Sequence, residues 1–244
     1  MDIPLYSKSK GRKSQILGAA LYRLFDSSSF CLHAQMRQAG SENEEFKDQL
    51  ERVANGTFSI KDWESWKTQD LATMVEPASS SFTNEATMLC ARKVDMISFN
   101  THHLKKTGNP IAKLKAENSP GASAFDSESA QGLRNTLFLS KGARVVLTSN
   151  LWTEAKLVNG SNGIVEYLVY KEGADSSKDL PSLVICHFPA YTGPSFLPGS
   201  VRLVPIVPKT VTWYSKGLQY SRSQFSLILS WALTIHKSQG IKCY

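Results

Sequence analysis

The sequence predicts an α/β protein in which a helical first part leads into a small β-barrel insertion and the chain then returns to helix. Three observations support this fold class. Apolar residues recur at helical spacing over the first quarter of the 244 residues. Five short apolar runs, separated by turn residues, follow between residues 137 and 207. Helical spacing returns after residue 225, and no internal repeat is present.

The first quarter is predicted to contain three helices. Residues 16–30 have apolar side chains on one helical face and end in a serine run. In residues 41–54, Ser41 and Glu44 stand three apart, which is typical of a capping box that opens a helix. Residues 59–66 form a further short helix that begins at Ser59 and carries two tryptophans. The apolar stripes of the first two helices comprise Leu17, Leu21, Leu24, Phe25, Phe46, Leu50 and Val53.

The middle of the chain changes from helix to strand. We expect a buried strand at residues 87–91, a helix at 94–106 and a loop at 116–132, which is rich in Ser, Ala, Gly and Pro. The spacing of Phe225, Ile228, Leu229, Ala232 and Ile235 predicts a helix from about 225 to 236. The strands of the predicted barrel are 137–139, 143–147, 164–169, 183–188 and 201–207.

The composition indicates a globular protein with a polyanionic partner. The net charge is +7, from 28 basic and 21 acidic residues, which favours phosphate contacts. No run of about 18 apolar residues and no signal-peptide pattern occurs, so we expect no membrane span and no secretion. The four cysteines are far apart and show no metal-ligand spacing, so we expect no metal site and a reducing compartment, the nucleus or the cytosol. A basic cluster is either a nuclear address or a solvated tail: Lys8, Lys10, Arg12 and Lys13.

The most specific motif lies near the end of the sequence. Residues 234–240 read TIHKSQG and are preceded by SRSQF at 221–225. The helix would bring an imidazole, an ammonium, a hydroxyl and an amide to a turn that ends in glycine, where the backbone can approach a phosphate closely. For a lone His-Lys pair, the alternative is an exposed polar helix end.

Two other segments carry candidate residues. Residues 32–38 read LHAQMRQ, and the guanidinium of Arg37 suits bidentate phosphate binding. Residues 137–165 contain LFLSKGARVVL, NLW and LVNGSNGIV, in which Asn159 and Gly160 form a tight hairpin turn. Taken alone, Arg37 also fits a helix surface, and Asn150 and Asn159 also fit turns.

Together these segments resemble the C-terminal half of the Pif-type, RecD-like 5′-to-3′ DNA helicases of superfamily 1, and the helicase half of Helitron transposases. Residues 32–38 look like motif IV of that family and residues 234–240 look like its motif V. The resemblance implies a second RecA-like domain that is interrupted by an SH3-like β insertion. It gives a helical segment at 1–75, RecA-like parts at 76–141 and 213–244, and the insertion at 142–212.

The resemblance also implies roles for individual residues. Arg37 would act catalytically by reaching the γ-phosphate of ATP, and Gln239 and Gly240 would help to sense the nucleotide. The residues expected to contact single-stranded DNA are Thr234, His236, Lys237 and Ser238 in motif V, and Asn150 and Asn159 in the insertion.

The sequence contains no GxxxxGK[ST] phosphate loop and no acidic pair of the Walker B kind. The resemblance places its start just after motif III and its end before motif VI. ATP hydrolysis in such motors needs the phosphate loop, magnesium and arginines together. We therefore expect ATP and Mg²⁺ in the complete enzyme and neither on this chain alone, whose partner would be an N-terminal RecA-like domain or a complete helicase.

Three functions stay open at this point. The first is a partial ATP-dependent helicase of DNA repair, recombination or telomere maintenance, inactive as an isolated chain. The second is a non-enzymatic single-strand-binding module derived from a helicase or a Helitron transposon. The third is a poorly folded product without activity.

Overall fold

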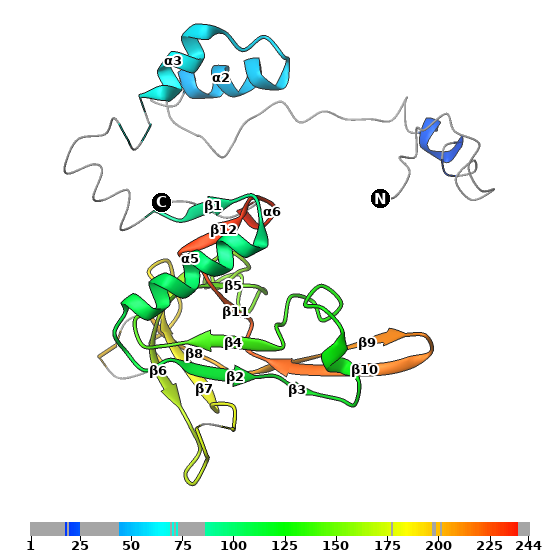
Figure 1. Ribbon diagram of the computed structural model, residues 1–244, viewed down its shortest axis with the longest axis vertical. Coiled ribbons are helices and arrows are strands. Elements are labelled where there is room, and N and C mark those ends of the chain that lie inside the picture. Colours follow the sequence, from blue (N-terminus) through cyan, green and yellow to red (C-terminus); the bar gives the residue numbers. More distant parts are fainter. Residues whose placement is uncertain are drawn as a thin grey trace. The chain divides into compact units, whose positions relative to one another are not determined.

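The computed structural model describes residues 18, 20–24, 44–68, 70, 72, 86–176, 178–196, 199–200 and 202–238. The chain divides into two compact units, Met1–Ser79 and Ser80–Tyr244. The described elements of the first unit are helical, and the second unit combines helices with strands (Figure 1). The predicted α/β class is therefore confirmed.

In the first unit, two helices are joined by polar side chains. They are α2, Glu44–Ala54, and α3, Ile60–Lys67, in agreement with the predicted ranges 41–54 and 59–66. Ser59 caps α3 by accepting from the backbone N–H of Asp62, while the Asp62 carboxylate accepts from the Ser59 backbone N–H. The Arg52 guanidinium donates to the same carboxylate and, with Ser59, holds the pKa of Asp62 well below its usual range.

The apolar stripe predicted for the second helix is only partly right. Phe46 and Val53 of α2 are exposed, whereas Gln49 is buried and accepts a hydrogen bond of 2.6 Å from the Trp66 indole. Residues 20–23 are helical inside the predicted 16–30 helix. Leu17, Phe25 and Ser41 lie outside the described residues.

The described strands of the second unit form four sheets. A parallel pair contains β1 (Met88–Cys90) and β12 (Ala232–Thr234). An antiparallel pair contains β2 (Ala112–Lys115) and β4 (Thr136–Leu139). The three-stranded sheet has the order β3 (Glu117–Asn118), β10 (Leu218–Gln224), β9 (Lys209–Ser215). The five-stranded antiparallel sheet has the order β11 (Leu227–Leu229), β5 (Arg144–Leu147), β6 (Asn162–Val169), β7 (Leu183–His187), β8 (Leu203–Ile206).

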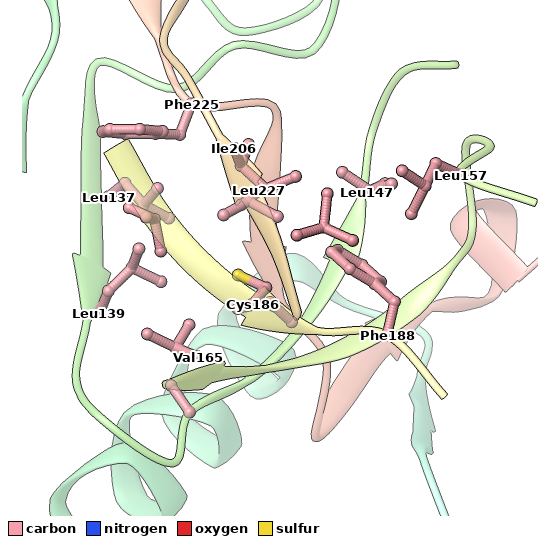
Figure 2. Close-up of a cluster of buried hydrophobic side chains, with 14 of the residues drawn as sticks. Leu137, Leu139, Leu147, Leu157, Val165, Cys186, Phe188, Ile206, Phe225 and Leu227 are labelled. Atoms are coloured by element: carbon pink, nitrogen blue, oxygen red, sulfur yellow. The ribbon is translucent and has the colours of Figure 1, made fainter. Parts of the chain in front are cut away.

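The main core lies where the five-stranded sheet meets β4. Side chains from these strands and from the connecting loops point toward one another in Figure 2. The residues of this cluster are fully or almost fully buried. Buried and half-buried residues alternate along β7 and β8, so one face of this sheet is more fully covered than the other. The five strands predicted between residues 137 and 207 are thus confirmed. The labelled core residues are Leu137, Leu139, Leu147, Leu157, Val165, Cys186, Phe188, Ile206, Phe225 and Leu227.

The predicted helix at 225–236 is wrong. This stretch forms β11, β12 and only a single helical turn, α6, at Ile235–Ser238. Leu227 pairs with Leu147, and both Leu227 and Ile228 are buried, so consecutive residues are apolar because both faces of the strand are covered. Such a short apolar run satisfies helical spacing by coincidence. Ser226 lies buried between β10 and β11.

The predicted loop at 116–132 is also partly wrong. It contains β3 and a 3₁₀ turn, Ala122–Ala124, and it folds around the side chain of Arg222 from β10. Arg222 is 0% exposed. Two further features were not predicted from the sequence: the strand β2, and the long hairpin of β9 and β10, which extends to the right in Figure 1.

Candidate nucleic-acid interface

The parallel pair brings two chain segments from distant parts of the sequence to one edge. Cys90 of β1 pairs with Thr234 of β12, so the carboxyl ends of both strands lie together. The chain leaves β1 for α5 (Lys93–Lys106) and leaves β12 for α6, and Figure 1 shows both helices beside the pair. In α/β proteins, the carboxyl edge of parallel strands is the usual place for ligands.

A buried amide fixes this arrangement. Asn100 of α5 donates to the Ala232 carbonyl oxygen (2.7 Å) and accepts from the Ala232 N–H (2.9 Å). Both backbone groups of one β12 residue are therefore satisfied by a side chain instead of a neighbouring strand. The position of α5 along β12 is set by this pair of hydrogen bonds.

The predicted strand at 87–91 is present, but its predicted burial is wrong. Met88 and Leu89 are each 50% exposed. Among the described strands, β12 is the only neighbour of β1. The other edge of β1 therefore pairs with no described strand.

The edge carries four cationic or titratable side chains. Arg92 and Lys93 stand at the start of α5, and His236 and Lys237 on α6, and all four are exposed. Arg92 donates to Asp95 (2.8 Å), which raises the pKa of the arginine, and Lys93 lies 3.4 Å from Glu128. The N-terminal turn of α5 has no side-chain cap, and its positive dipole end adds to the field at this edge.

Some of the predicted site residues lie at this edge. Thr234 is half-buried at the end of β12, His236 and Lys237 are exposed, and Ser238 ends α6. Three predicted nucleotide-site residues lie outside the described residues: Arg37, Gln239 and Gly240.

Asn150 and Asn159 come together in a different place, a turn that follows β5. Asn150 Oδ1 accepts a 2.8 Å hydrogen bond from the Asn159 backbone N–H. Gly160 next to it has a φ of 95°, which favours glycine, and donates to the Leu147 carbonyl. The side-chain Oδ1 of Asn150 therefore stabilises the turn, and the side chains of Asn150 and Asn159 are exposed to solvent.

Arg92 and Lys93 were not predicted from the sequence as site residues. The available signal was their position directly after a predicted strand and before a predicted helix, which places them at the carboxyl edge. Within the described ranges, no group of three His, Cys, Asp or Glu side chains could hold a metal ion. The helices in the same ranges are also too short or too polar to cross a membrane.

Comparison with curated proteins finds similar DNA helicases. The chain is 32% identical over 159 residues to the ATP-dependent DNA helicase PIF1 of Danio rerio and 30% identical over 156 residues to that of Homo sapiens. Each match covers 64% of this chain and 22% of the relative. The chain is a homologue of the Pif1-type DNA helicases. It spans about a fifth of the length of these curated relatives. No protein-family model matches it.

Solved structures of Pif1 helicases share the fold. The Candida albicans enzyme aligns with a TM-score of 0.57 and 23% identity, over 85% of this chain and 47% of that one. A Bacteroides Pif1 in complex with ADP-AlF4 aligns with a TM-score of 0.57 and 21% identity, over 95% of this chain and 51% of that one. The mixed α/β architecture described above is thus that of a Pif1 helicase over about half of its length.

Proposed function

We propose that this chain is the strand-gripping part of a Pif1-type, 5′-to-3′ ATP-dependent DNA helicase that works on DNA in the nucleus. The observation that carries the proposal is the exposed His236-Lys237 pair, held at the carboxyl edge of a parallel strand pair in a homologue of these helicases. A Bacteroides Pif1 bound to single-stranded DNA has the same fold. Repair, recombination and telomere maintenance are the processes in which we place the complete helicase.

In this proposal, β1, β12 and α5 belong to a second RecA-like domain, and residues 142–212 form an SH3-like insertion within it. The helical segment 1–75 precedes the first RecA-like part at 76–141, and the second part covers 213–244. The antiparallel arrangement of β5 to β8 supports the insertion, and the parallel register of β1 with β12 supports the RecA-like domain. Thr234 to Ser238 would contact the DNA backbone, and Asn150 and Asn159 would lie along the same strand.

The nucleotide side of the proposal concerns Arg37, Gln239 and Gly240. Arg37 would reach the γ-phosphate of ATP, whose Mg²⁺ and phosphate loop would come from an N-terminal RecA-like domain or a complete helicase. The Bacteroides Pif1 structure with ADP-AlF4 supports a nucleotide site in proteins of this fold.

The 244-residue chain alone is expected to release no phosphate from ATP, with or without single-stranded DNA. Its sequence has no GxxxxGK[ST] loop to hold the triphosphate, and arginines without that loop and its magnesium cannot stabilise the transition state. Steady-state phosphate release is the measurement, with a complete Pif1 helicase as the positive control. Turnover above the buffer background that scales with protein concentration would contradict the proposal.

Replacing Lys237 with alanine is expected to weaken binding of single-stranded DNA about tenfold at low salt. The variant loses one phosphate contact, so its plot of log affinity against log salt should be shallower by about 0.7. Fluorescence anisotropy of a labelled oligothymidylate measures both quantities. The matched control is Lys171→Gln, because Lys171 is an exposed lysine in the loop after β6. Equal affinities for Lys237→Ala and the parent would refute the assignment.

A further inference from the structure

A small pocket is lined by α5, by β4 with the segment before it, and by Leu229 of β11. Its volume is about 60 Å³, and its polar lining comes from Asn100 and Thr101 of α5 and from Arg134 and Thr136 at the start of β4. Since one water needs roughly 10–15 Å³ measured in this way, the pocket has room for about four waters, the size of a phosphate group. Ile97 and Phe138 add two exposed apolar side chains to the lining.

Arg134 gives the pocket its charge. The side chain is half-buried, and this burial lowers its pKa. Among the described residues, no carboxylate forms an ion pair with it. The contrast with Arg222 is informative, because the donors of Arg222 all meet carbonyl or amide oxygens. Arg134 has the planar fork that binds an oxyanion, and it is the cationic residue in a recess whose other lining is mainly apolar.

Two lysines extend this charge along the hairpin. In the register of β2 with β4, Lys113 stands opposite Phe138 and Lys115 opposite Thr136. Residues paired in this way have their Cβ atoms about 5 Å apart on one face of the sheet. Both lysines are exposed, while Leu114 between them is buried. The face of the β2–β4 pair that carries the exposed ring of Phe138 therefore also carries Lys113 and Lys115, and Arg134 lies just before β4.

We propose that this pocket binds one phosphodiester of a single nucleic-acid strand, with Arg134 clamping the phosphate and Phe138 stacking on the adjoining base. The Thr136 hydroxyl at the recess donates to the same phosphate, whereas the Thr101 hydroxyl already donates to the Ile97 carbonyl. An unpaired base offers its face to a ring of this kind, and the two lysines on the neighbouring strand β2 suit the adjacent phosphates. This inference rests on the proposed function, since it adds a second contact point for the strand that Lys237 binds.

The helix α5 leads from the carboxyl edge to the pocket. Lys93, at the carboxyl edge, is eight residues before Thr101 in the same helix. At a rise of 1.5 Å per residue, that separation is about 12 Å along α5. A strand that leaves the edge along this helix would therefore reach the pocket within a short stretch.

The test compares Arg134→Gln with the parent chain in titrations with labelled oligothymidylate over a series of salt concentrations. We expect affinity to fall about tenfold and the salt dependence to become shallower by about 0.7. Phe138→Ala should lose several-fold in affinity with no change in the salt dependence, because it removes stacking and no charge. Lys171→Gln is the matched control. Lys115→Gln, on an exposed strand position, should make the salt dependence shallower, and it keeps the test valid if Arg134→Gln fails to fold.

A second arm separates nucleic acid from free phosphate as the occupant. Inorganic phosphate at constant ionic strength should displace the oligonucleotide only weakly, and equally from the parent and from Arg134→Gln. If the parent binds, Lys237→Ala binds weakly, and Arg134→Gln and Lys115→Gln both match the parent, the pocket proposal is refuted while the proposed function stands. If phosphate binds through Arg134 while oligonucleotide affinity ignores it, the pocket proposal is again refuted. If the parent binds no single strand, both fall together.

Discussion

Replacing Arg222 with methionine is expected to lower the free energy of unfolding of the second unit by about 3–5 kcal/mol. The guanidinium is fully buried, and it donates to Asn118 Oδ1 and to the carbonyl oxygens of Ala122, Phe125 and Leu133, each at 2.9 Å. A further donor reaches the Asp126 carbonyl at 3.3 Å. Methionine fills much of the space but donates to none of these oxygens, so buried acceptors lose their partners.

Urea unfolding followed by circular dichroism measures this loss, and limited proteolysis locates it in residues 119–135. Arg222→Lys should recover only part of the stability, because an ammonium has three donors that do not share the planar geometry of a guanidinium. Asn118→Ala removes one acceptor of Arg222 and one donor to the Ala116 carbonyl, and should cost about 1–2 kcal/mol. A methionine variant within 1 kcal/mol of the parent, with an equally resistant 119–135 segment, would show that the arginine does not organise this segment.

Replacing Asn100 with leucine is expected to cost about 2–4 kcal/mol and to weaken single-strand binding through α6. The amide is the partner of both the N–H and the C=O of Ala232, and leucine leaves both groups buried without a hydrogen bond. The strand β12 that positions Thr234, His236 and Lys237 then loses its link to α5. Binding should fall even though no residue at the carboxyl edge has been changed.

The control is Asn109→Ala, which removes an exposed amide that donates to the Lys141 carbonyl at 3.0 Å. We expect it to change stability by less than about 1 kcal/mol and to leave binding unaffected. Asn100→Asp keeps the acceptor for the Ala232 N–H but loses the donor to the Ala232 carbonyl. Its stability should therefore lie between that of Asn100→Leu and that of the parent. Unfolding midpoints measure the stability, and anisotropy titrations measure the affinity for single-stranded DNA. An Asn100→Leu variant with the affinity of the parent would show that the link between α5 and β12 does not support binding at the carboxyl edge.

Much of the strand content could be predicted because turn residues mark its limits. Pairs such as Asn159-Gly160 and Lys141-Gly142 interrupt apolar runs at regular intervals, and both glycines have a positive φ. The error at residues 225–236 has the opposite origin. Strands buried on both faces lose the alternation that identifies a strand, and the apolar spacing that is left fits a helix equally well.

The loop around Arg222 could not be predicted from local sequence. The conformation of this loop is fixed by Arg222, whose side chain lies about a hundred residues later in the sequence. The Ser, Ala and Gly content of the loop does not indicate such a partner. The residues of the candidate site also fall into a group that the sequence indicates and a group that only the structure reveals. The string TIHKSQG identifies the α6 residues, but the role of Asn100 and the proximity of Arg92 and Lys93 depend on the parallel register of β1 with β12.

The long separations between these partners determine the order in which the molecule can be completed during synthesis. Arg222 is made 89 to 104 residues after the groups that it binds, and Ala232 is made 132 residues after Asn100. At a translation rate of about 5–20 residues per second, the earlier segments wait several seconds to tens of seconds for their partners. Chaperones that shield nascent chains would therefore meet β1, α5 and the 119–135 segment in an unfinished state until residues 222–232 have been made.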